Sequence, residues 1–285
     1  MNVLVATDGS KYGNWALQWI ARIPLVKAPK VKVLHVVDVV ALRAPFVVQP
    51  VVVGTERYLK AEISRLEAHA KKTKQESAAL LKSLKLRGRV VMARGGVNAT
   101  IVKEAKKGVQ LLAMGSRGLD ALDRFMLGSV STYAMHHVPC SMLIVKEAPR
   151  PIREIVLAID GSSSSKKAVN FLLRSMRPWE DVPDQELITV TVTHVMPFLK
   201  YPELREAGKV MVEQYADQLA KAGYLVNQAP KLGKPADEVL ELAHHRKADL
   251  IVTGAKGMGA IGRLLLGSVS TRVVQHSSCS VLIAR

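Results

Sequence analysis

The chain contains an internal repeat, and this repeat restricts the folds available to it more than any other feature. The string LGSVST stands at 127–132 and again at 266–271, 139 residues later. Near the start of each copy, VLVATDGS at 3–10 corresponds to VLAIDGS at 156–162. A repeat of this kind means that one structural unit is present twice. The 285 residues therefore predict one domain over 1–148 and a second over 152–285. Further matched pairs at the same offset are Gly115 and Gly254, Gly118 and Gly257, Arg124 and Arg263, and Cys140 and Cys279.

Within each copy, short apolar runs alternate with helical patterns, which is typical of a parallel sheet built from β-α-β units. The runs are rich in Val, Leu and Ile without polar alternation, so helices should cover both faces of the sheet. The fold class is therefore α/β, with two tandem five-stranded, Rossmann-like domains. We expect strands near 2–7, 31–37, 89–93, 109–114 and 141–146, and near 154–159, 187–195, 224–228, 249–253 and 280–284. The expected helices are 11–22, 55–85, 97–107 and 129–137, then 163–176, 202–222, 235–246 and 268–276.

A glycine motif follows the fourth expected strand of each copy, at the sheet edge where such folds bind ligands. It has the form G-x2-G-x9-G-S-V-S and begins at Gly115 in the first copy and at Gly254 in the second. Glycines let a backbone approach an anion, and a helix start directs N–H groups toward it. The motif therefore predicts a phosphate site in each copy. Candidate phosphate contacts are Arg117, Arg124, Lys256 and Arg263.

An aspartate ends the first strand of each copy, Asp8 and Asp160, and Gly and Ser follow it before a helix. Such a carboxylate could accept a hydrogen bond from ribose or adenine, or lie near a magnesium ion. It could equally be an ordinary helix cap. The segment DGSSSSK at 160–166 weakly resembles the phosphate loop of nucleotide pyrophosphatases.

Together these residues resemble the universal stress protein family of the UspA type. The likeness rests on an opening strand ending in DGS, a second strand ending in HVV or HVM, the glycine motif, and a final Val/Leu/Ile strand. It covers practically the whole chain twice. It implies an adenine nucleotide alpha hydrolase-like fold, pairing of the two domains through their last strands as a pseudo-dimer, further homodimerisation, and ATP, with or without Mg²⁺, as the ligand.

The family's ATP-binding branch also implies which residues form each site. The first site would use Asp8, Val36, Met114, Gly115, Gly118, Gly128, Ser129, Val130 and Ser131. The second would use Asp160, Val195, Thr253, Gly254, Gly257, Gly267, Ser268, Val269 and Ser270. The chain departs from the family pattern where Ala6 and Ala158 replace a frequent Pro, and where Thr253 replaces the more frequent Met or Leu.

The net charge of +17 is distributed unequally between the copies. Residues 1–150 carry 24 Lys and Arg against 10 Asp and Glu, a net +14, whereas the rest carries 17 against 14, a net +3. The segment 71–89 concentrates these cations without interleaved aromatic residues. It is either a solvated helix face or the binding surface of a basic adaptor for nucleic acid, polyphosphate or an acidic protein.

Other features limit the function. Two cysteines outside any CxxC pair indicate a reducing compartment, and the absence of a signal-peptide pattern or a long apolar run predicts a cytoplasmic protein. No Ser-His-Asp or Cys-His arrangement is shared by both copies, and we expect neither a metal site nor dedicated catalysis. The sequence thus predicts an ATP-binding, nucleotide-responsive stress or regulatory protein in which any hydrolysis is slow and incidental. The alternatives are an ATP-pyrophosphatase-like or adenylating enzyme on the same fold, and the basic adaptor.

Overall fold

The computed structural model describes residues 1–41, 55–118, 127–179, 187–196, 202–257 and 266–285. Every predicted strand and helix is present, with bounds within two residues of the prediction. The first half contains β1 (Asn2–Ala6), α1 (Lys11–Arg22), β2 (Lys30–Val37), α3 (Thr55–Ser83), β3 (Gly88–Arg94), α4 (Val97–Ala105), β4 (Leu111–Gly115), α5 (Ser129–His137) and β5 (Ser141–Val145). The second contains β6 (Glu154–Ile159), α6 (Ser163–Ser175), β7 (Thr189–Met196), α7 (Pro202–Lys221), β8 (Leu225–Gln228), β9 (Lys231–Leu232), α8 (Pro235–His245), β10 (Leu250–Gly254), α9 (Ser268–His276) and β11 (Ser280–Ala284). The short strand β9 was not predicted.

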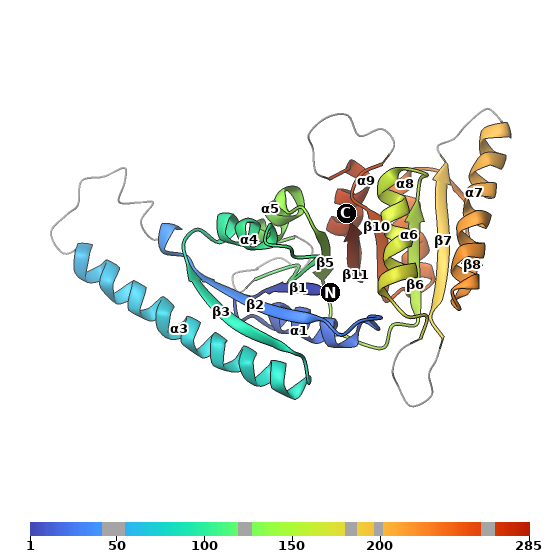
Figure 1. Cartoon of the computed structure of the whole chain (residues 1–285). Coiled ribbons are helices and arrows are strands. Elements are labelled where there is room, and N and C mark those ends of the chain that lie inside the picture. The colour runs from blue at the N-terminus through green and yellow to red at the C-terminus, as the bar shows by residue number, and fades with distance from the viewer. Residues whose placement is uncertain (42–54, 119–126, 180–186, 197–201, 258–265) are drawn as a thin grey trace.

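The described strands form one eleven-stranded sheet (Figure 1). Their order is β3-β2-β1-β4-β5-β11-β10-β6-β7-β8, and β9 pairs with β7 beside this path. Each half contributes five strands to the path, and neighbours within a half are parallel, as predicted. The strand order reverses between β1 and β4 and between β6 and β10. These two reversals are where an open α/β sheet binds ligands.

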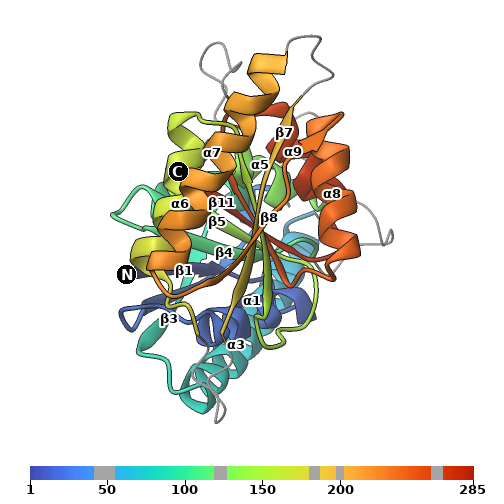
Figure 2. The ribbon, with the colours of Figure 1, turned by 90° about the vertical axis from the view of Figure 1, so that its right-hand side faces the viewer.

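Helices cover both faces of the sheet (Figure 2). Helices α1, α3, α6 and α7 pack on one face, and α4, α5, α8 and α9 pack on the other. Successive strand residues point to opposite faces, so Leu4 belongs to one core and Val5 to the other, and both are fully buried. The apolar strand runs are thus explained by burial on both sides.

The two halves join where β5 pairs with β11 in antiparallel orientation. Leu143 lies opposite Leu282 at the centre of this pairing, and every residue of both strands is buried. The pseudo-dimer implied by the family resemblance is confirmed. Because the central strands are antiparallel, the carboxyl ends of the parallel strands point to opposite edges of the sheet in the two halves. The two candidate sites therefore lie on opposite edges.

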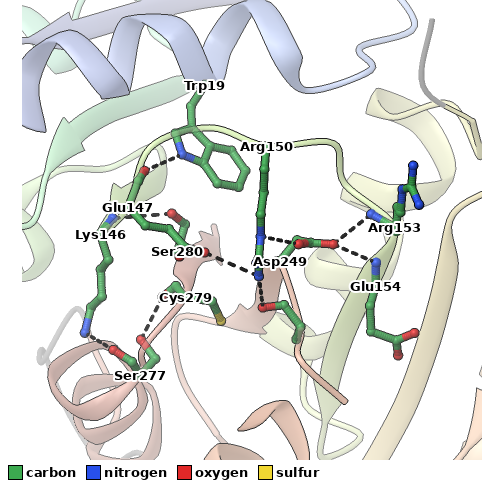
Figure 3. Close-up of polar contacts among 11 residues, drawn as sticks. Trp19, Lys146, Glu147, Arg150, Arg153, Glu154, Asp249, Ser277, Cys279 and Ser280 are labelled. Carbon is green, nitrogen blue, oxygen red and sulfur yellow. Dashed lines mark hydrogen bonds and ion pairs between the residues drawn. The ribbon is translucent and has the colours of Figure 1, made fainter. Parts of the chain in front are cut away.

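A cation at the end of each central strand crosses to a helix of the other half. The Nζ of Lys146 donates to the carbonyl oxygens of Ser277, at 2.6 Å, and Gln275, at 3.3 Å, beyond and within the last turn of α9 (Figure 3). At the matching position after β11, the guanidinium of Arg285 donates to the carbonyl of Met135 in α5. Each cation thus satisfies carbonyls at a helix C-terminus, where the helix dipole favours positive charge.

The segment between β5 and β6 is held by one buried carboxylate (Figure 3). The Oδ2 of Asp249 accepts hydrogen bonds from the backbone N–H of Arg153, at 2.8 Å, and of Glu154, at 3.0 Å. Its Oδ1 pairs with the Nε of Arg150 at 2.6 Å. Asp249 directly precedes β10, so this cluster holds the backbone at the start of β6 against the start of β10.

The crossing lysine predicts a dependence of stability on pH. Burial lowers the pKa of the Lys146 ammonium group from 10.5 to about 8, with Cys279 opposing the shift and Arg117 adding to it. Between pH 8 and 10.5 the unfolded chain holds more protons at this residue than the folded one, so its contribution to stability rises with pH. We expect wild type to gain up to about 3 kcal/mol relative to Lys146→Met across this window.

The measurement is urea unfolding of both proteins at pH values from 7.5 to 10.5. Burial also raises the pKa values of Cys279 and Tyr224, which gives an opposite trend, and comparison with the variant removes the part of this trend that does not depend on Lys146. Parallel stability curves would show that the Lys146 ammonium group is not the source.

Candidate functional site

Each aspartate after the first strand organises a turn, and the neighbouring serine caps the helix. The Oδ1 of Asp8 accepts from the N–H of Ser10 at 3.0 Å, and the Oγ of Ser10 accepts from the N–H of Gly13 at 3.2 Å. The second half repeats this with Asp160 and Ser162. The helix cap is therefore the serine, and the aspartate is not needed for it.

The aspartate meets the second glycine of the motif in both halves. A Cβ added to Gly118 would lie 2.6 Å from the Oδ2 of Asp8, and one added to Gly257 would lie 2.8 Å from the Oδ2 of Asp160. The carboxylate and the glycine loop, distant in sequence, are thus in contact at the reversal of strand order. The sequence motifs predicted at this edge come together as one constellation in each half.

The first glycine of the motif has a packing role. A Cβ on Gly115 would lie 2.5 Å from the Cβ of Tyr12 and 2.9 Å from its backbone carbonyl carbon. At Gly254 the corresponding neighbours are backbone atoms of Ser164 and Ser165, at 2.5 to 2.7 Å. These glycines let the first helix of each half lie directly on the end of the fourth strand.

The third glycine closes the loop. The N–H of Gly128 donates to the carbonyl of Ser116 at 2.8 Å, and the N–H of Gly267 donates to the carbonyl of Ala255 at 2.7 Å. Two of the four candidate phosphate contacts, Arg124 and Arg263, lie outside the described residues.

Gly128 and Gly267 also begin helices whose first turns lack a side-chain cap. Both adopt extended backbone at the N-cap position, and no acidic residue occupies either first turn. A Cβ on Gly128 would meet its nearest neighbour only at 3.4 Å, so neither packing nor backbone conformation requires glycine there. The N-terminal amides of α5 and α9 are therefore open to an anion.

The serines of these helix starts differ in their role. Ser131 and Ser270 are buried, and each donates its hydroxyl to the carbonyl of the first motif glycine at 2.7 Å. Ser129 and Ser268 are exposed at the first turn. Val130 and Val269 stand between them on the same turns, half-buried and exposed respectively. Of the predicted serines, only Ser129 and Ser268 therefore keep their hydroxyl donors for a ligand.

The ends of the second strands border the same edge. His35 donates from Nδ1 to the carbonyl of Thr7 at 3.0 Å, and His194 does the same to Ile159 at 2.9 Å. Burial lowers the pKa of His35. The histidines are structural, and they tie the second strand to the first. The residues after them, Val36 and Val195, are half-buried and buried respectively.

The residues before the first glycine differ between the two halves. Met114 packs in the core beside α4 and α5, whereas Thr253 donates its hydroxyl to the carbonyl of Gly254 at 3.3 Å. Beyond that glycine, Arg117 donates to the hydroxyl of Tyr12 at 2.8 Å, and its guanidinium lies over the Tyr12 ring. Lys256 stands at the corresponding place in the second half.

Two buried donors beside the first loop lack hydrogen-bond partners among the described residues. They are the Oγ of Ser116 and the Nε of Arg117. The second half has Ala255 in place of Ser116, so the serine hydroxyl is particular to the first loop. Unpaired buried donors are rare in proteins, so these two could serve a polar group that approaches the loop.

Sequence reasoning missed the contribution of α3 to the first site. The Nε2 of His69 lies 3.0 Å from the carbonyl oxygen of Asp8, within hydrogen-bonding distance. A Cβ on Gly9, which adopts a positive φ of 88°, would lie 2.6 Å from the Oγ1 of Thr73. In the second half, burial raises the pKa of Tyr215 in α7, and the nearby carboxylate of Asp160 raises it further. A lone histidine and threonine in a helix gave no sequence signal for this contact.

The described residues contain no cluster of three or more His, Cys, Asp or Glu side chains that could hold a metal ion. Within the same part of the chain, no helix is long and apolar enough to cross a membrane.

Cys140 and Cys279 are free and buried, and burial raises the pKa of both thiols. Both cysteines are therefore small buried side chains of the apolar core.

Comparison with known proteins shows which family this sequence and fold resemble. The family model described as "Universal stress protein family" matches residues 1–146 and again residues 151–285. A universal stress protein of Mycolicibacterium smegmatis is 26% identical, with 99% of this chain and 96% of that protein covered. One from Thermus aquaticus is 34% identical over 47% of this chain and 98% of its own length. The crystal structure of a universal stress protein from Archaeoglobus fulgidus has a TM-score of 0.70 at 19% identity, covering 100% of this chain and 96% of that one.

The different roles of the glycines can be separated by stability measurements. We expect Gly115→Ala to lower the free energy of unfolding by about 1–3 kcal/mol, because the added Cβ collides with α1. Gly128→Ser should leave it within about 0.5 kcal/mol of wild type or raise it, because serine is a favoured N-cap residue. Thermal and urea unfolding test both variants, and equal destabilisation would contradict these roles.

Proposed function

The chain belongs to the universal stress protein family, with two family units in tandem, and from this premise we propose that it binds ATP at two sites, one in each half. The sites lie at the two reversals of strand order and use the glycine loops. The first comprises Asp8, Val36, Met114, Gly115, Gly118, Gly128, Ser129, Val130 and Ser131. The second comprises Asp160, Val195, Thr253, Gly254, Gly257, Gly267, Ser268, Val269 and Ser270.

The observation that carries this proposal is the open helix start beside a carboxylate, present twice. At Gly128 and at Gly267, uncapped amides begin a helix within a loop whose other end contacts Asp8 or Asp160. An uncapped helix start attracts phosphate, whereas a carboxylate attracts hydroxyl or amino groups. A nucleotide carries both kinds of group at its two ends.

The residues of the first site fit such a ligand. The space beside Gly128 that a Cβ would fill is not crowded by protein atoms, since the nearest is 3.4 Å away. The Ser116 hydroxyl is buried without a partner among the described residues. The amides of α5 and the Ser129 hydroxyl would receive the phosphates, and Asp8 the ribose or adenine. If magnesium accompanies the nucleotide, Asp8, whose carboxylate lies against Gly118, is a carboxylate that could meet it. The phosphates would supply the negative charge that this helix start favours.

We assign no catalytic residue to either site. Ser10, Ser131 and the Nδ1 of His35 are engaged within the protein at the first site. A loop that cradles phosphates without a placed base stabilises the bound state more than a transition state. The protein is therefore a nucleotide-responsive regulator, acting through the conformation or partners of its ATP-bound form.

The rival enzyme function would require DGSSSSK at 160–166 to act as a phosphate loop. Two of its four serines have other roles: Ser162 donates its hydroxyl to the carbonyl of Lys256 at 3.1 Å, and Ser165 donates to the carbonyl of Ser162 at 3.0 Å. These engaged hydroxyls favour binding over an adenylating or pyrophosphatase-like reaction. Mass spectrometry of nucleotide released from the heat-denatured protein would identify the ligand, and pyrophosphate release would point to the enzyme.

Substitution of the helix starts tests the assignment. In Gly128→Asp and Gly267→Asp, the new carboxylate caps the helix and repels phosphate, so the fold is retained while binding is lost. We expect each variant to weaken ATP binding at its own site by at least 10-fold in calorimetry, and the double variant to abolish it.

Two controls accompany this experiment. Asn170→Asp adds the same charge on the exposed surface of α6 and should leave ATP affinity unchanged. Adenosine, which lacks phosphates, should lose much less affinity than ATP in the two glycine variants. Unchanged ATP affinity in the double variant, with its thermal stability retained, would refute the site assignment.

A further inference from the structure

The first half carries a row of cations on one surface, which we name the basic ridge. It consists of Lys71, Lys74, Lys82 and Lys85 along α3 and its exit, with Arg87 and Arg89 at the start of β3. All six side chains are exposed. This surface lies at the outer end of the sheet, where α3 runs beside β3 (Figure 1). It is distinct from the glycine loops.

The lysines share one side of the helix. Glu67, Lys71 and Lys74 follow the spacing i, i+4, i+7, and Lys82 continues the same stripe. Lys85 follows just beyond the end of α3. Glu67 pairs with Arg94 of β3, so this side of α3 faces the outer edge of that strand. Lys71 and Lys82 are eleven residues apart, which is about 17 Å at the rise of an α-helix. The ridge is therefore a continuous strip of charge along the sheet edge.

These six cations have no acidic partner among the described residues, unlike their neighbours. Lys72 pairs with Glu76, and Lys32 pairs with Glu104. The segment 71–89 contains seven Lys or Arg and a single acidic residue, Glu76. Within the described structure, the positive charge of the ridge is therefore not neutralised.

The fold does not require this charge. Helix α7, which covers the matching position in the second half, has three basic and four acidic residues in its twenty positions. Like charges at helical spacing destabilise a helix slightly. The helix dipole favours Lys82 and Lys85 near the carboxyl end of α3, but it does not extend to Lys71 and Lys74. The ridge is a feature of one half alone, and packing does not explain it.

We propose that the basic ridge binds a linear phosphate polyanion, of the kind presented by a nucleic-acid backbone or by inorganic polyphosphate. A row of separate cations that covers about 17 Å along α3 and continues beyond its end matches a ligand whose charge repeats along its length. The ridge has no aromatic residue to stack on a base, so it contacts the phosphates alone and without sequence preference.

Other anionic partners fit the ridge less well. Helix docking of an acidic protein would need an apolar anchor, and the ridge residues supply only charge and alkyl chains. An anionic membrane would favour an amphipathic helix with a free apolar face, whereas the apolar face of α3 packs on the sheet through residues such as Ala70 and Leu81.

The experiment measures fluorescence anisotropy of a labelled 30-base-pair duplex in 50 to 200 mM NaCl, without nucleotide. The variant replaces Lys71, Lys74, Lys82 and Lys85 with Gln. We expect at least a 10-fold loss of affinity, and a salt dependence that is shallower by up to about four counterions. Displacement of the duplex by inorganic polyphosphate would identify a shared phosphate site, and failure of displacement would assign the ridge to nucleic acid.

A matched control separates the ridge from net charge. It replaces Lys166, Lys167, Lys209 and Lys221 of the second half with Gln, removing the same four charges from exposed positions. Equal losses in both variants, or unchanged affinity in the ridge variant, would overturn the proposal. Binding to vesicles with phosphatidylserine or to polyglutamate, without binding to the duplex or polyphosphate, would also overturn it. ATP affinity should stay unchanged in the ridge variant, which keeps this result independent of the glycine loops.

Discussion

Val281, Leu282 and Ile283 of β11 lie across from residues of β5 in the antiparallel pairing that joins the halves, and the rest of the architecture depends on it. Unpaired, each central strand would expose a row of backbone N–H and C=O groups beside apolar side chains, an edge that proteins avoid. The pairing also brings Lys146 and Arg285 to helices of the opposite half. Trp19 adds a hydrogen bond from its indole N–H to the carbonyl of Glu147, at 3.0 Å, just beyond β5. One pairing thus sets the relative position of the two halves and places the two sites at opposite edges of the sheet.

The glycine motif combines two requirements that a sequence pattern cannot separate. Gly115 and Gly254 are needed because a helix lies against them, whether or not a ligand binds. Gly128 has neither a crowded Cβ position nor a positive φ, so the protein alone does not explain it. An approaching anion explains it, because a missing side chain leaves the helix amides accessible. The presence of glycine at the third motif position, rather than at the first, is therefore the evidence for a ligand.

Much of this fold was predictable from the sequence because its strands are buried on both faces and occur twice, as the runs ending in Asp8 and Asp160 illustrate. Strand β9 escaped prediction because two residues carry no periodicity. The antiparallel pairing came only from the family resemblance, since β5 and β11 are as apolar as their parallel neighbours. The contact of His69 with Asp8 escaped because it joins residues 61 positions apart through tertiary packing. Local patterns thus predict elements and loops, whereas the contacts between them require the structure.

The two halves also show how one fold tolerates different chemistry at the same place. The first loop has the Ser116 hydroxyl and the Arg117 guanidinium held on Tyr12, whereas the second has Ala255 and Lys256. A guanidinium fixed by an aromatic ring loses less side-chain freedom on meeting a phosphate than a free lysine does. The first site therefore offers more preorganised donors than the second. A difference in nucleotide affinity between the halves would arise from these loop residues together with Met114 and Thr253 and the different contacts from α3 and α7.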